Sequence, residues 1–312
     1  MTRIRSMIGR AALCVASLSL LAACSTDSPP DLPPASDSRA IAEAVQGPDG
    51  RVFLDDIIAY PWQDGGRDAG ARFDWIGEDA TSSDHDDAAR AADTAHALAA
   101  FLAENRTAVS AAPPNPAVFE ALSRSLVPFV GALVGDPGTT PAFRPLDDVG
   151  GSMSQTAALF ATMIGREATT ATFVDVASDR ADADERAFAG AAASNPSTIT
   201  AEYLGGLLRA ARLRGLLTAG STLADPNAPE PTLLAARTQN AYAVAAAMVP
   251  PNEPSIERAF FGPTGELLGP ERIPSAQWSQ YDAQLRQYLA AYPAITDALQ
   301  QFDTTFRRIA DQ

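Results

Sequence analysis

Three aspartates and two tryptophans lie close together in the sequence, the one place where acids and sugar-stacking aromatic residues coincide. Asp55 and Asp56 precede Trp62, and Asp74 directly precedes Trp75. Paired carboxylates can cleave glycosides without lysine, cysteine or histidine. The group therefore supports the hypothesis of a carboxylate-dependent envelope hydrolase, although solvated loops often have the same composition.

Other catalytic chemistries are excluded by residues that the chain lacks. There is no lysine, and the cysteines are Cys14 and Cys24. Without lysine there is no Walker A loop, no Schiff base with pyridoxal phosphate and no Ser-Lys dyad. Cys14 and Cys24 belong to an export signal described below, so disulfides, thiol nucleophiles and Cys-rich zinc sites are excluded as well. We expect no enzyme activity and no cofactor.

Two segments have metal-binding residue types without a metal-binding pattern. His85 and His96, if on one helix, are separated by roughly 16 Å along its axis, too far to share a zinc ion. "SSDHDDAAR" (residues 82–90) is interpreted as a helix start capped by Ser82 or Ser83, with a metal site as the alternative. "DADE" (residues 182–185) lacks the glycine and the distal glutamate of an EF-hand loop and is interpreted as a solvated helix face.

The N-terminus is organised as an export signal. Arg3, Arg5 and Arg10 precede an apolar run from Ala11 to Ala23, which is the order of regions in a signal peptide. A helix of this length spans roughly 20 Å, against about 30 Å of hydrocarbon, so the run is too short to cross a bilayer.

The run ends in Leu21-Ala22-Ala23-Cys24, which resembles the lipobox of bacterial lipoproteins. The resemblance implies removal of residues 1–23 and a diacylglyceryl group on the Cys24 thiol. Two acyl chains hold a domain stably on a membrane. We therefore expect an exported protein, anchored through lipidated Cys24 to the outer face of the cell membrane. The alternative is an ordinary secretory signal cut near Ala23, with Cys24 an incidental thiol.

Composition also restricts the partners. Residues 24–38 are rich in serine, aspartate and proline, and they predict a stiff polar tether. Loss of residues 1–23 removes three arginines and no acids, so the mature chain has 20 arginines against 38 acids and a charge of −18. Nucleic-acid binding needs a basic surface, so no nucleic-acid partner is expected. The lack of lysine and the abundance of alanine point to a GC-rich genome, such as those of actinobacteria.

The hydrophobic pattern predicts an all-α protein, a multi-helix bundle or irregular helical array, with a short extended or hairpin region near the N-terminus of the mature chain. That region is the turn-rich segment 39–82, in which Val52–Tyr60 could equally continue a helix. The remaining parts are a helical domain at 83–249, an irregular linker at 250–274 and amphipathic helices at 275–312 that pack on the bundle.

Three details of the helical part can be tested. The apolar stripe from Trp278 to Ile309 should be split or kinked at Pro293. Ala117–Val134 is apolar on most sides and should be a buried helix, with a membrane-dipping hairpin as the alternative. Three glycines should allow a neighbouring helix to approach closely: Gly205, Gly206 and Gly215.

Four segments carry a family resemblance: "FDWIGEDATSSDHDDAARAADTAHALAAFLAEN", "NPAVFEALSRSLVPFVGALVG", "GSMSQTAALFATMIGREATTATFVDVA" and "LGGLLRAARLRGLLTAGS". Together they resemble the α-helical "TPR repeat region" of large actinobacterial, often mycobacterial, proteins associated with WXG100-type secretion or polymorphic toxins. The resemblance covers about Phe73–Met248 and implies helix packing, not a reactive site. The 34-residue marks of a tetratricopeptide array are not visible.

These features predict a lipid-anchored, non-enzymatic helical module for protein–protein interaction at the cell envelope. In a more specific version it is accessory to a secretion or toxin system. The alternatives are the carboxylate-dependent hydrolase and a lipoprotein that binds a lipid or another small apolar ligand between its helices.

Overall fold

The structure is a computed structural model that describes residues 28–113, 115–136, 138, 140–166, 170–227 and 233–311. Over these residues the chain is helical, and its one extended pairing is an isolated antiparallel bridge between Phe261 and Leu267. The expected all-α class is confirmed. The elements up to residue 133 are α1 (Ser38–Gln46), α2 (Gly50–Ala59), α3 (Arg67–Gly70), α4 (Asp74–Asp79), α5 (His85–Glu104), α6 (Arg106–Ala111), α7 (Pro116–Leu126), the 3-10 turn η1 (Val127–Phe129) and α8 (Val130–Leu133).

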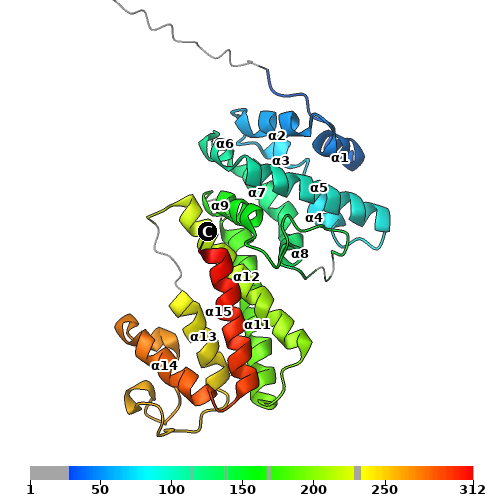
Figure 1. Cartoon of the computed structure of the whole chain (residues 1–312). Helices are drawn as coiled ribbons and strands as arrows, with labels where there is room; N and C mark the ends of the chain where they lie inside the picture. The colour runs from blue at the N-terminus through cyan, green and yellow to red at the C-terminus, as the bar shows by residue number, and fades with distance from the viewer. Residues whose placement is uncertain are drawn as a thin grey trace, which may run out of the picture.

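The second part of the chain supplies longer helices. They are α9 (Ser154–Ile164), the π-helical turn η2 (Thr170–Val174), α11 (Asp175–Ser194), α12 (Ala201–Ala224), α13 (Leu233–Ala245), the 3-10 turns η3 (Arg258–Phe260), η4 (Pro270–Arg272) and η5 (Ser275–Gln277), α14 (Trp278–Leu289) and α15 (Pro293–Ala310). Figure 1 shows α1 to α8 in the upper half and α11 to α15 in the lower half, with α9 between them. Helix α9 contacts α5 and α6 on one side and α12 on the other.

The extended or hairpin region expected within residues 39–82 is wrong, because the chain forms α1 to α4 there. Most of Val52–Tyr60 belongs to α2, which buries Leu54, Ile57 and Ile58. This spacing places the three side chains on one face of a helix. Packing of α2 against α1 outweighs the strand preference of valine and isoleucine.

The second half of the predicted tether, residues 24–38, contacts the folded part of the protein. Leu32 is partly buried and packs on the hydrophobic core. The carbonyl of Pro33 accepts a hydrogen bond from Arg72 Nε at 3.1 Å. The predicted tether, which begins at the expected anchor, therefore ends near residue 31, whereas the composition predicts an end at residue 38.

The apolar segment 117–134 packs inside the fold as α7, η1 and α8. Among the described residues, Pro116–Leu133 is the one stretch long and apolar enough to cross a membrane by composition, and 67% of it is buried. Buried core helices commonly have this composition, and α7 packs against α3 and α4. Val127–Phe129 forms a 3-10 turn around Pro128, which lacks the amide hydrogen that an α-helix needs.

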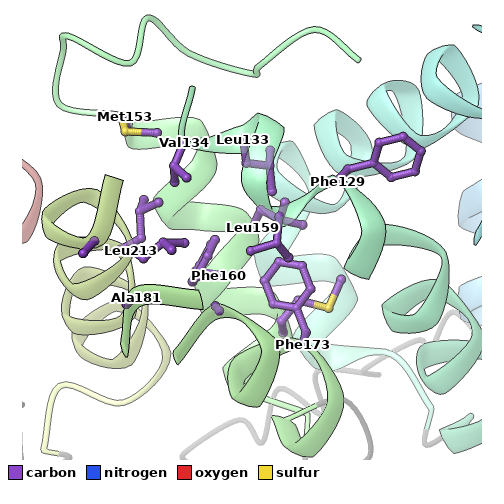
Figure 2. Close-up of a cluster of buried hydrophobic side chains, with 14 of the residues drawn as sticks. Phe129, Leu133, Val134, Met153, Leu159, Phe160, Phe173, Ala181 and Leu213 are labelled. Atoms are coloured by element: carbon purple, nitrogen blue, oxygen red, sulfur yellow. The ribbon is translucent and has the colours of Figure 1, made fainter. Parts of the chain in front are cut away.

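A continuous apolar cluster joins the two parts of the fold (Figure 2). Phe129 and Leu133 reach it from η1 and α8, Phe160 from α9, Phe173 from η2 and Leu213 from α12, and each is at most 1% exposed. The rings of Phe160 and Phe173 meet edge to face with centroids 5.0 Å apart, a favourable aromatic geometry. The two parts therefore share one hydrophobic core.

Helix α12 is the element on which the second part is packed, and it contacts α9, α11 and α15. A Cβ at Gly215 would lie 3.0 Å from the Cβ of Ile309 and 3.1 Å from the carbonyl oxygen of Phe306, both on α15. A Cβ at Gly220 would lie 2.9 Å from the Cβ of Phe160 on α9. Only glycine allows both neighbours to approach this closely.

Of the three glycines expected to permit a close helix approach, Gly215 does so. Gly206 faces the side chain of Asp184, and Gly205 faces that of Arg209. The sequence did not single out Gly220, because the apolar residues around it are equally dense on every side of the helix.

The C-terminal stripe forms α14 and α15, which are separated at Pro293 as predicted. Pro293 is the first residue of α15. Proline lacks an amide hydrogen, and at this position of a helix an amide hydrogen would have no partner within the helix. Residues 250–274 are irregular, as expected. Within them Phe260 is 1% exposed, and its ring lies 4.9 Å from that of Tyr281 on α14.

Two helical glycines test the close packing at α12. Gly220→Ala would place a Cβ 2.9–3.1 Å from atoms of α9, so we expect the free energy of unfolding to fall by about 1–3 kcal/mol. Gly190→Ala, at an exposed position of α11 with nothing within 4 Å of the new Cβ, should raise it by about 0.4–1 kcal/mol. Urea unfolding measures both, and a stabilising Gly220→Ala would contradict the described contact.

Candidate functional site

The predicted lipidation site lies outside the described residues. Ala23 and Cys24 precede residue 28, where the described chain begins. Cleavage after Ala23, acylation of Cys24 and export therefore stay predictions.

The tryptophans of the suggested carbohydrate site are structural. Trp75 is 9% exposed. Trp62 is half buried, and its indole N–H donates to the carbonyl of Ile57 at 2.8 Å. Asp55 and Asp56 lie on the exposed side of α2. Trp75 is thus nearly buried and Trp62 is half buried, so neither is an exposed platform of the kind on which sugars stack.

Asp74 is engaged in an ion pair between α4 and α7. Its carboxylate lies 2.9 Å from Arg124, which also pairs with Glu120 at 2.9 Å. Asp74, Glu78 and Arg124 line an open pocket of about 500 Å³ that includes none of the other residues of the suggested carbohydrate site. Asp74 therefore lines this pocket without Asp55 or Asp56.

The "SSDHDDAAR" segment starts helix α5. Asp84, rather than Ser82 or Ser83, is the N-cap, and its carboxylate accepts from the amides of Asp86 at 2.8 Å and Asp87 at 3.3 Å. The prediction that this segment starts a helix is confirmed, but the N-cap is one or two residues later than predicted.

His96 lies further along α5 and has a structural contact. Its Nδ1 is 2.8 Å from the carbonyl oxygen of Arg144, and its ring meets Phe143 edge to face at 6.0 Å. In the part of the chain that the structure describes, no three His, Cys, Asp or Glu side chains form a group that could hold a metal ion.

The solvated face expected at "DADE" is wrong for its last two acids. The side chain of Asp184 is 18% exposed and pairs with Arg209 at 3.0 Å. The side chain of Glu185 is 6% exposed and pairs with Arg214 of α12 at 2.9 Å. The same guanidinium pairs with Asp182 and donates to Ser178 Oγ at 3.2 Å. Asn240 of α13 donates to Glu185 Oε1 at 3.3 Å. The residues that connect α11, α12 and α13 in this way are here called the Arg214 cluster: Ser178, Asp182, Glu185, Arg214 and Asn240.

Charged side chains are buried only where partners replace the water that they lose. Burial by itself lowers the pKa of Arg214, but hydrogen bonds and the negative charges of Glu185 and Asp182 raise that pKa above its ordinary value. The guanidinium is therefore held in its charged form between the helices.

A second buried ionic cluster joins α13, α14 and α15. The side chain of Asp282 is 1% exposed and accepts from Arg237 Nε at 2.9 Å and from Arg286 Nε at 3.2 Å. Arg286 also reaches Asp303 of α15 at 3.1 Å. Burial raises the pKa of Asp303, in spite of the two arginines nearby.

Two further arginines hold the loop before α9 against α12 and α15. Arg212 donates to the carbonyls of Val134 at 2.9 Å and Val149 at 3.0 Å, and Arg308 donates to that of Gly150 at 2.6 Å. Burial, and then the charges of neighbouring arginines, lower the pKa of Arg212. Both arginines line a polar pocket of about 490 Å³ between the two helices.

The outer side of α2 combines an exposed apolar side chain with acids. Val52 is 58% exposed, the highest value among the large hydrophobic side chains described. Asp55 and Asp56 follow at the i+3 and i+4 positions, which lie beside Val52 on a helix surface. We call Val52, Asp55 and Asp56 the α2 face.

Comparisons with known protein families, with curated proteins and with solved structures each find no match to this chain. The resemblance to the TPR repeat region therefore stays a prediction.

The sequence contained one signal for the Arg214 cluster. Arg209, Arg212 and Arg214 lie in a helix that is otherwise apolar enough to be buried, and buried arginines need acceptors. The identity of the acceptors depends on which helices pack together, which the local pattern does not specify.

Removal of one member of the Arg214 cluster should destabilise the fold more than removal of an exposed ion pair. Arg214→Met leaves Glu185 buried without its cation, so we expect a loss of about 3–5 kcal/mol in the free energy of unfolding. Arg124→Met, which breaks an exposed pair, should cost less than about 1 kcal/mol.

Replacing both partners, in Arg214→Met with Glu185→Met, should recover most of the loss because no buried charge is then left unpaired. Urea unfolding of the three variants gives the comparison. Equal losses for Arg214→Met and Arg124→Met would show that the cluster does not hold the helices together.

Proposed function

We propose that this protein is a lipid-anchored, non-enzymatic helical module that binds another protein at the outer face of the cell membrane. The observation that carries the proposal is the distribution of charge. Partly buried arginines pair with the buried carboxylates of Glu185 and Asp282 between the helices, whereas the α2 face presents two aspartates and an exposed valine to solvent.

Part of the positive charge of the protein is neutralised in ion pairs between helices. Asp282 pairs with two arginines, from α13 and α14. Asp136 pairs with Arg180 and Arg209. The expected mature chain has a charge of −18, so the surface available to a partner is predominantly acidic. Such a surface attracts proteins with a basic face and accelerates their association.

The α2 face fits a partner of defined chemistry. Interfaces commonly surround an apolar contact with a polar rim that sets specificity. Val52 can supply the apolar contact, while Asp55 and Asp56 can supply acidic neighbours. The matching surface is a shallow apolar pocket with arginine or lysine beside it.

The anchor would keep this module close to the membrane. Seven residues, Ser25–Asp31, separate the expected lipidated cysteine from the first core contact at Leu32. Extended at about 3.1 Å per residue they span roughly 20 Å. A partner within or directly above the membrane surface is therefore favoured. The version in which that partner belongs to a secretion or toxin system is supported by the predicted resemblance alone.

The proposal is tested by crosslinking in intact cells and co-purification through a C-terminal tag. We expect the native protein to capture a reproducible envelope partner. Cys24→Ala should leave the membrane fraction and lose the partner. Asp55→Asn with Asp56→Asn should keep the anchor but lower the yield of partner several-fold, because charges at the rim of an interface control its association rate.

A control with the same change of charge is Asp175→Asn with Asp179→Asn, which removes two exposed acids from one side of α11. It should leave the yield unchanged. Capture of no partner by the native protein, or equal losses in the two double variants, would contradict binding through the α2 face.

A further inference from the structure

A second candidate site, an apolar cavity, lies where α9, α12, α13 and α15 converge. Its volume is about 330 Å³, within the range of roughly 300–1,000 Å³ that is usual for ligand pockets. Figure 1 shows α15, in red, running beside α12 toward α9. The apolar side chains that line the cavity come from five elements: Ile164, Val174, Leu217, Ala236 and Phe306.

The walls of the cavity are fixed by the backbone contacts of α12. Gly220 brings α9 against α12 beside Ile164, whose Cδ1 would lie 3.1 Å from a Cβ at that position. Gly215 brings α15 against α12 beside Phe306, whose carbonyl oxygen would lie 3.1 Å from a Cβ there. Leu217 lies between the two glycines and lines the cavity. The space is therefore bounded by two close helix contacts, which a change of side-chain rotamer cannot remove.

The charged group at the cavity wall already has its partners. The Arg214 guanidinium is bound by Asp182, Glu185 and Ser178. Because the cluster contains two carboxylates and one guanidinium, its net charge is negative, and it would repel a carboxylate or phosphate ligand. A charged ligand would also lose its hydration without a new partner.

Two hydroxyl groups can orient an uncharged ligand. Ser221 donates to the carbonyl of Leu217 at 2.8 Å, and its oxygen can still accept a hydrogen bond. Ser178 accepts from Arg214, and its own proton can be donated. A single hydroxyl or carbonyl oxygen on a ligand can use one of these groups.

We propose that this cavity binds a small, uncharged, hydrocarbon-rich molecule with one hydroxyl or carbonyl oxygen. At the roughly 30 Å³ that a water molecule occupies in the liquid, the space holds on the order of ten heavy atoms. This site is separate from the α2 face and does not depend on the proposed protein partner.

Fluorescence of 1-naphthol, an uncharged apolar probe with one hydroxyl group and a size that the cavity admits, tests the proposal. The sample is the complete mature chain with Cys24→Ala, which removes the expected acyl chains and keeps every described residue. We expect saturable binding of one probe molecule per chain. 1-Decanol should displace the probe, whereas decanoate, of equal length but charged, should displace it at least about tenfold less well, a difference of about 1.4 kcal/mol.

Adjacent residues of α12 provide a matched pair of variants. Ser221 lines the cavity and Thr222 does not, and each donates its hydroxyl to the carbonyl four residues earlier. Ser221→Leu should fill the cavity and weaken probe binding at least about tenfold, because the larger side chain occupies the space that the probe needs. Thr222→Leu should change it by less than about twofold.

If Ser221→Leu does not fold, as judged by far-UV circular dichroism, Leu217→Phe narrows the same cavity and should weaken binding in the same direction. Absence of saturable probe binding would overturn the proposal. Equal affinity in the Ser221 and Thr222 variants, or equal displacement by decanol and decanoate, would overturn it as well.

Discussion

The contact of α9 and α15 with the backbone of α12 is the constraint on which the rest of the structure depends. Gly215 and Gly220 leave no room for a side chain at the two contacts. Helix α11 is held on α12 by the Arg214 cluster. Since α9 also packs on α5 and α6, the position of α12 determines how the first part of the chain joins the second. The apolar cavity lies between the same two glycine contacts.

Alanine-rich helices explain why so much charge lies inside this protein. An alanine side chain buries little apolar area, so packing alone orients such helices weakly. Arginine–carboxylate pairs reach across the space between them and have a defined geometry. The Arg214 cluster and the cluster around Asp282 act in this way. Because several arginines are engaged between helices and acids outnumber arginines in the chain, the surface is predominantly acidic, and the proposed protein interaction relies on this charge.

The sequence predicted those features that depend on local pattern. The stripe from Trp278 to Ile309 and the break at Pro293 follow from periodicity and proline geometry, and both are present. Local pattern could not decide between a helix and a strand for residues 52–60. Isoleucines such as Ile57 and Ile58 favour a strand, and only the packing of α2 against α1 decides for a helix. Glu185 pairs with a residue 29 positions away, so its burial depends on tertiary contacts. The cavity likewise depends on side chains from six elements, spread along the chain from α9 to α15.

A photo-crosslinking amino acid at Val52, in intact cells that express the anchored chain, tests the central claim most directly. The account predicts an ultraviolet-dependent crosslink from position 52 to one envelope protein, at a segment rich in arginine or lysine. The same group at Ala187, an exposed position on α11, should not capture it. No crosslink from position 52, or the same product from both positions, would contradict the assignment of the α2 face as a protein-binding surface.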